Sequence, residues 1–173
     1  MARLREGYTR PMLRVQRMRL LAACAVFSTI TVTGCTGRPA SVASWQSSSD
    51  RAIGEALSGL GTARLAIKLE TRDRAPHTYT VVTVTDAIES SSKEVSTYQV
   101  AQPPDSLHRA NKVVGQALDD AVSLMVDVRV ALASPGLTAA SARGLVARID
   151  ALRKKLDDLD SAVTTSPGSV GTS

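Results

Sequence analysis

The stretch LVARIDALRKKLDDLDSAV, residues 145–163, decides the fold. Its large apolar residues recur at gaps of four and three positions, which is the spacing of one face of an α-helix. They are Leu145, Ile149, Leu152, Leu156, Leu159 and Val163. A continuous row of this kind is typical of a helix that packs against its neighbours in a bundle. The sequence therefore predicts an all-α protein.

The segment before this helix repeats the same spacing. Its apolar row is Val114, Leu118, Ala121, Met125, Val128 and Leu132. The segment follows Pro103-Pro104-Asp105, where we expect Asp105 to cap the first turn, and Ser134-Pro135-Gly136 should end it. Thr138 is then placed to cap the last helix. Because the connection between the two helices is short, they are expected to be antiparallel neighbours.

Two further helices are predicted between residues 50 and 103. The first, Asp50–Thr71, has an apolar side made by Ile53, Leu57, Leu60, Ala63 and Ile67. The second contains Thr78–Thr85, whose β-branched and aromatic composition favours a strand. Gaps of three and four from Val81 to Tyr98 favour a helix instead, and we predict a helix. The four segments together predict an up-down-up-down four-helix bundle over residues 50–164.

The positive charge of the chain is confined to its beginning. The formal charge is +5, and residues 1–34, with six arginines and one glutamate, already account for it. The remainder is formally neutral, whereas a phosphate-binding surface needs clustered Lys and Arg. Nucleic acid is therefore not an expected partner.

Residues 1–34 have the order of a secretion signal, which is an Arg-rich stretch through Arg19, an uncharged run over Leu20–Val32 and small residues at Thr33 and Gly34. The run is too short for a membrane-spanning helix, which needs about 20 apolar residues. A cleaved signal is expected. Met1, Met12 or Met18 could each be the start, since all three leave basic residues ahead of the run.

Val32-Thr33-Gly34-Cys35 resembles the lipobox of bacterial lipoproteins, with Val32 where Leu is usual. The resemblance implies lipidation of Cys35 through a thioether and cleavage after Gly34. The alternative is an ordinary signal peptide with a chance cysteine at its end. Cys24, the other cysteine, lies inside the run and would be removed with it, which leaves Cys35 without a disulfide partner.

Residues 35–49 are predicted to be the lipidated cysteine and a disordered tether, because the stretch is rich in Ser, Ala, Gly and Pro and has no apolar periodicity. Residues 165–173 are predicted to be a disordered tail. Two interpretations of Trp45 stay open: a ring at the membrane interface, or a cap on the folded domain. The bundle with Thr62-Ala63-Arg64-Leu65-Ala66 and Gln102-Pro103-Pro104-Asp105 is similar to small helical envelope proteins of actinobacteria.

No catalytic or metal-binding motif is recognised, so no enzyme, cofactor or resident metal ion is expected. His77 and His108 are placed at the starts of two successive helices, hence at opposite ends of the bundle. The acidic clusters Asp119-Asp120 and Asp157-Asp158-Asp160 could hold a hard cation, but charged pairs four residues apart are the simpler use. These pairs are Asp150 with Lys154, Arg153 with Asp157, and Lys154 with Asp158.

Ser91 falls on the apolar face of its helix, where it could form a polar layer, open space for a ligand, or pack as a small residue bonded to a carbonyl. Two functions follow from these features. The first is a lipid-anchored, extracytoplasmic interaction or scaffold module of the cell envelope that contacts a protein, with Arg129, Arg143 and Arg148 at the rim of the interface. The second is a carrier or sensor of an apolar small molecule or lipid, with a cavity at Ala63, Ser91 and Ala121.

Overall fold

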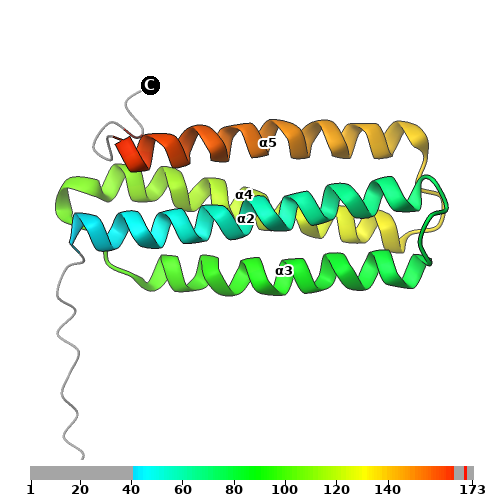
Figure 1. Cartoon of the computed structure of the whole chain (residues 1–173), viewed down its shortest axis with the longest axis horizontal. Helices are drawn as coiled ribbons and strands as arrows, with labels where there is room; N and C mark the ends of the chain where they lie inside the picture. Colours follow the sequence, from blue (N-terminus) through cyan, green and yellow to red (C-terminus); the bar gives the residue numbers. More distant parts are fainter. Residues whose placement is uncertain (1–40, 166–169, 171–173) are drawn as a thin grey trace, which may run out of the picture. The chain divides into compact units, whose positions relative to one another are not determined.

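A computed structural model describes residues 41–165 and residue 170. It contains α2 (Val42–Glu70), α3 (His77–Val100), the short 3-10 helix η2 (Asp105–Leu107), α4 (His108–Ala133) and α5 (Ala139–Thr165), and no strand among the described residues. The four long helices run alternately up and down beside one another (Figure 1). The predicted all-α, up-down-up-down bundle is confirmed.

The bundle has a skewed cross-section in which α2 and α4 approach each other across the centre. Helix α2 packs on all three of the others, whereas α3 and α5 lie on opposite sides and barely touch. The buried residues follow this arrangement, because most of them lie on α2 and α4. Helix α5 buries fully only one row at heptad spacing: Ala142, Ile149, Leu156 and Val163. Ile149 and Leu156, which belong to the apolar row predicted for this helix, therefore do face the core.

The helix ends follow local sequence in most places. The Thr138 hydroxyl accepts a hydrogen bond from the Ser141 amide at 3.1 Å, as predicted for a cap on α5. Helix α4 ends at Ala133 with Ser134 as its cap, and Gly136 takes a left-handed φ of 92° in the turn that follows. The predicted cap at Asp105 is wrong. Pro104 precedes η2 and no side chain caps it, while Asp105 instead lies 3.5 Å from His108.

The residues Thr78–Thr85 are helical, which confirms the prediction from spacing over the one from composition. Their threonines return hydrogen bonds to the backbone one turn earlier. Thr83 donates to the Tyr79 carbonyl at 2.8 Å and Thr85 to the Val81 carbonyl at 2.9 Å. These hydrogen bonds satisfy the hydroxyl groups within the helix, where they would otherwise favour non-helical backbone conformations.

The prediction of a tether through Ser49 is wrong for residues 42–49, because helix α2 begins at Val42 and not at Asp50. The Ser41 hydroxyl caps it by accepting a hydrogen bond from the Ser44 amide at 3.1 Å. At the other end of the chain, Val170 is buried in the core, so the predicted disordered tail does not apply to this residue. The rest of that tail after Thr165 lies outside the described residues. Within the part of the chain that is described, none of the helices combines the length and apolar character required to cross a membrane.

Candidate functional site

The predicted signal peptide and Cys35 lie outside the described residues. The nearest described residue is Ser41, the cap of α2, six positions after Cys35. In the sequence, Cys35 thus precedes the end of the bundle at which α2 begins. We call this end, where α2 begins and α5 finishes, the anchor end.

Trp45 lies at the anchor end with only 2% of its surface exposed. Its indole Nε1 donates to Asn111 Oδ1 on α4 at 2.8 Å, and its carbonyl accepts from the Ser49 hydroxyl at 2.9 Å. Tyr98 on α3 reaches the same place and donates to the Asn111 carbonyl at 3.4 Å, and burial raises the pKa of its hydroxyl. Of the two interpretations of Trp45, the cap on the folded domain is confirmed.

The two histidines occupy opposite ends of the bundle, at the starts of α3 and α4 (Figure 1). Because α3 has 24 residues, they are separated by about 36 Å. His77 Nδ1 lies 2.8 Å from Glu70 Oε1, and His108 lies 3.5 Å from Asp105. They cannot share a ligand. Among the described residues, no group of three or more His, Cys, Asp or Glu side chains is arranged to hold a metal ion.

Glu70 joins the end of α2 to the start of α3. One carboxylate oxygen accepts from the buried Thr80 hydroxyl at 2.7 Å and the other contacts His77 at 2.8 Å. The hydrogen bond from Thr80, followed by that from His77, holds the pKa of Glu70 below its ordinary value. The folded chain therefore favours the ionised form of Glu70, which makes it a structural clamp on the α2–α3 turn.

Glu70→Gln is expected to lower the free energy of unfolding by about 1 kcal/mol at pH 7, because a charge-assisted hydrogen bond is weakened. A carboxyl group whose pKa is lowered by folding contributes stability above its unfolded pKa, near 4.3, and loses it as the pH falls through the folded pKa. The difference between the two proteins should therefore vanish in strong acid. Urea unfolding of both across this pH range measures it, with the exposed Glu89→Gln as control. If Glu70→Gln lowered the free energy of unfolding equally at all pH values, the negative charge of Glu70 would not be the cause.

The charged residues of the predicted acidic clusters mostly bond to neighbours. Lys154 and Asp158 form the predicted pair, at 2.8 Å. The predicted pair of Asp150 and Lys154 is wrong, because Asp150 instead pairs with Arg64 on α2 at 2.8 Å. The predicted pair of Arg153 and Asp157 is also not formed within the described bundle. Asp119 accepts from Gln99 at 2.8 Å and Asp120 pairs with Lys155.

Three carboxylates remain together on the seam between α2 and α5 near the anchor end. We call Asp50, Asp157 and Asp160 the acidic patch. None of them forms an ion pair within the described bundle, and Asp160 Oδ1 is buried without a hydrogen-bond partner there. Burial and the neighbouring Asp50 raise the pKa of Asp160. The neighbouring Lys154, which pairs with Asp158, also interacts with the charge of Asp157. The patch therefore carries an excess of negative charge that is only partly balanced.

The far end of the same seam carries the opposite charge. A groove of about 490 Å³ lies between the last turns of α2 and the first turns of α5. Ile67, Ala142 and Val146 contribute apolar side chains to its lining. Lys68, Arg72 and Arg143, which we call the basic patch, also line it, and none of the three forms an ion pair within the described residues. Arg143, one of the three arginines predicted at the rim of an interface, thus lies exposed at this groove.

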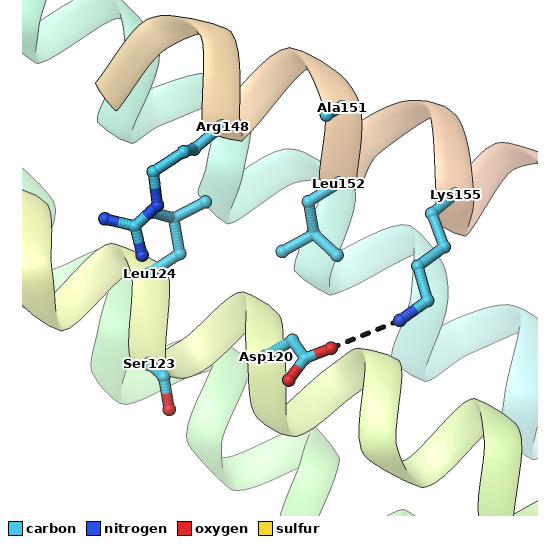
Figure 2. Close-up of a pocket in the computed structure, with 7 residues that line it drawn as sticks. All are labelled: Asp120, Ser123, Leu124, Arg148, Ala151, Leu152 and Lys155. Atoms are coloured by element: carbon cyan, nitrogen blue, oxygen red, sulfur yellow. Dashed lines mark hydrogen bonds and ion pairs between the residues drawn. The ribbon is translucent and has the colours of Figure 1, made fainter. Parts of the chain in front are cut away.

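A second groove, of about 440 Å³, lies between α4 and α5. Figure 2 shows Lys155 reaching from α5 to Asp120 on α4, and this pair measures 3.2 Å. One heptad along each helix, Arg148 pairs with Asp127 at 2.8 Å. The groove lies between these two ion pairs, over Leu124 and Leu152. The two ion pairs therefore bridge α5 to α4 on either side of the groove, and Arg148, the second predicted rim residue, belongs to one of them. Arg129 is only partly exposed.

Ser91 packs against α2 in the middle of the bundle. A side-chain carbon added at Gly59 would lie 2.6 Å from Ser91 Oγ and 2.7 Å from Met125 Sδ. The Ser91 hydroxyl is 3.5 Å from the Glu55 carbonyl. Of the three interpretations, the small packing residue agrees best with this contact.

A ligand cavity at Ala63, Ser91 and Ala121 would require these residues to lie at one level of the bundle, and they do not. Helices α2 and α4 run in the same direction, and Gly59 faces Met125. Ala63 lies four residues past Gly59, and Ala121 lies four residues before Met125. The two alanines are therefore about 12 Å apart along the bundle.

Sequence reasoning missed the interhelical partners Arg64, Asn111 and Asp127. The sequence did contain a signal for the pairing of Asp127 with Arg148. Asp120 and Asp127 are spaced by one heptad, as are Arg148 and Lys155. Comparisons with protein-family models, with curated proteins and with solved structures found no match to this chain.

Proposed function

We propose that the chain is a lipoprotein, held on the extracytoplasmic side of a bacterial membrane by lipid on Cys35, whose bundle is a non-catalytic interaction or scaffold module of the cell envelope. The observation that carries this proposal is the position of Val32-Thr33-Gly34-Cys35. The motif follows an Arg-rich stretch and an uncharged run, and it ends six residues before the cap of α2.

The short connection limits how far the anchor end could lie from a lipid on Cys35. Six residues span at most about 20 Å when fully extended. The 29 residues of α2 are about 44 Å long. An anchor on Cys35 would keep the anchor end beside the lipid headgroups, while the basic patch at the far end could extend tens of ångströms from the surface.

The partner that we propose is another envelope protein. Residues 35–173 are formally neutral, so broad electrostatic binding is not favoured. Charged residues such as Arg143 and Arg148 would instead act as rim contacts, which tune association rate and specificity more than affinity.

Cys35→Ala is expected to abolish labelling of the full-length chain by a fatty-acid analogue and to move the protein from the membrane fraction to the soluble extracytoplasmic fraction. The physical reason is that each buried methylene contributes about 0.8 kcal/mol to membrane affinity, so two or three acyl chains anchor the protein firmly. Metabolic labelling and fractionation of cells that express each variant measure both effects.

The matched control is Cys24→Ala, which removes the other cysteine and should leave labelling and fractionation unchanged. If Cys35→Ala is labelled and fractionates like the wild type, the anchor is wrong. If the two cysteine variants lose the label equally, the label does not report on the motif.

The carrier function keeps one supporting observation. Each groove beside α5 has a volume within the range of small-molecule sites, about 300–1,000 Å³. Such sites usually enclose most of their ligand, and both grooves are open along their length. Native mass spectrometry of the delipidated chain discriminates between the functions, because only a carrier would retain a stoichiometric small molecule.

A further inference from the structure

The seam between α2 and α5 separates charge along its length. The acidic patch lies near the anchor end, and the basic patch lies at the opposite end. Along α5, Arg143 and Asp157 are 14 residues apart, which corresponds to about 21 Å. Each patch lacks ion-pair partners within the described residues, while the Arg64–Asp150 pair between them is neutral. One face of the molecule thus carries two complementary charges that cannot reach each other.

The outer side of α2 between the patches carries no charge. Gly54, Ser58, Gly61 and Leu65 follow at gaps of four, three and four, so they lie along one side of the helix. Leu65 is 55% exposed, and a side-chain carbon added at Gly54 or Gly61 would meet nothing within 4 Å. No neighbouring side chain therefore covers Gly54 and Gly61, and a second protein surface could approach the helix backbone closely there.

We propose that this α2–α5 face pairs with the same face of a second copy of the chain, in antiparallel orientation about a two-fold axis. Such an axis brings the acidic patch of each copy against the basic patch of the other, as a self-complementary interface requires. A parallel pair would place like charges together, which opposes association. The axis would pass near Gly61, where no neighbouring side chain covers the helix.

The size of the face is sufficient for a specific interface. Helix α2 is about 44 Å long, and two helices packed side by side cover a width of about 20 Å. The face therefore offers roughly 800 Å² per copy, which is the area of a standard protein–protein interface. This inference goes beyond the proposed function, and it holds whether or not Cys35 carries lipid.

The face also favours a second copy over two other occupants. An acidic helix from another protein would fit the basic patch but leave the acidic patch uncompensated. A small anionic amphiphile would fill the groove and leave the uncharged middle of α2 exposed. A second copy covers all three parts of the face at once.

Charge exchange between two full-length chains tests the proposal. One chain carries Arg143→Glu and the other Asp157→Lys, each with its own affinity tag, and co-capture from mild detergent after co-expression is the readout. Each variant should self-associate about tenfold less than the wild type, because like charges then meet at both ends of its homodimer. The two variants together should associate as well as the wild type, because every contact between them joins opposite charges.

Arg143 and Asp157 are both exposed, and neither forms an ion pair within the described bundle. Circular dichroism should therefore show unchanged folding of both variants. Arg109→Glu, on α4 away from this face, is the control and should associate normally. Failure of the mixed pair to associate would overturn the proposal, as would a wild type that is monomeric at micromolar concentration. The same assay on a Cys35→Ala background separates this result from that of the anchor, since pairing should persist there.

Discussion

Trp45→Ala is expected to lower the free energy of unfolding by about 3–5 kcal/mol, the usual loss when a buried Trp is truncated. The ring is almost fully buried at the anchor end and connects α2 to α4 through Asn111. Its removal leaves a cavity and also takes a donor from Asn111. Since domains of this kind are stabilised by only about 5–15 kcal/mol, the loss is a large part of the total. Urea or thermal unfolding followed by circular dichroism measures it.

Trp45→Phe is the matched control, because it keeps most of the ring and removes the indole N–H. The expected loss is about 1 kcal/mol, the net value of one hydrogen bond. Asn111 is partly exposed, so water can replace the lost donor. If Trp45→Ala were as stable as the wild type, residues 42–49 would not form part of the folded bundle, and the original prediction of a tether there would return.

Gly59→Val is expected to lower the free energy of unfolding by about 1–3 kcal/mol, the usual cost of overpacking a core. The first carbon of any side chain at this position would meet Ser91 Oγ and Met125 Sδ well inside contact distance. Met125 is flexible and can move, but Ser91 is short and fully buried. The helices α2 and α3 must therefore separate to admit the valine, which denaturant unfolding should detect.

Gly61→Ala provides the contrast on the same helix. Nothing lies within 4 Å of the added carbon, so the gain in helix propensity should stabilise the bundle by up to about 1 kcal/mol. Gly59→Val combined with Ser91→Gly should recover part of the loss, because the close contact is relieved. If Gly59→Val and Gly61→Ala changed the free energy of unfolding in the same direction, the explanation from close packing at Gly59 would be contradicted.

The fold was predictable where apolar residues are large and regularly spaced. Helices α4 and α5 were predicted from their leucines, valines and isoleucines, and proline and glycine marked the turn between them. The start of α2 was not predictable in this way. Ser49 and Ala52 are buried one turn and two turns after Trp45, but serine and alanine carry little hydrophobic signal. Whether such residues are buried depends on what packs on them, and here Tyr98 of α3 lies beside Ser49.

The candidate surfaces were less predictable than the fold. Pairs on a single helix can be read from sequence spacing, and Lys154 with Asp158 is one of them. Pairs between helices depend on how each helix is rotated and shifted, which spacing within one helix does not determine. Asp150 illustrates the difference, because it had a candidate partner on its own helix and pairs with Arg64 across the bundle. The same applies to the acidic and basic patches, which exist only because α2 and α5 are adjacent.

The order of the helices also has a consequence for the rate at which the chain folds. Each helix lies beside its successor in the sequence, and the contacts of α2 with α4 and with α5 join more distant segments. Proteins dominated by such local contacts fold within microseconds to milliseconds, because little loop-closure entropy precedes each contact. If the chain is exported as proposed, it could thus assemble α2, α3 and α4 in sequence as they emerge from the translocation channel. The packing of α4 and then of α5 on α2 would be the steps that require closure over a longer stretch of chain.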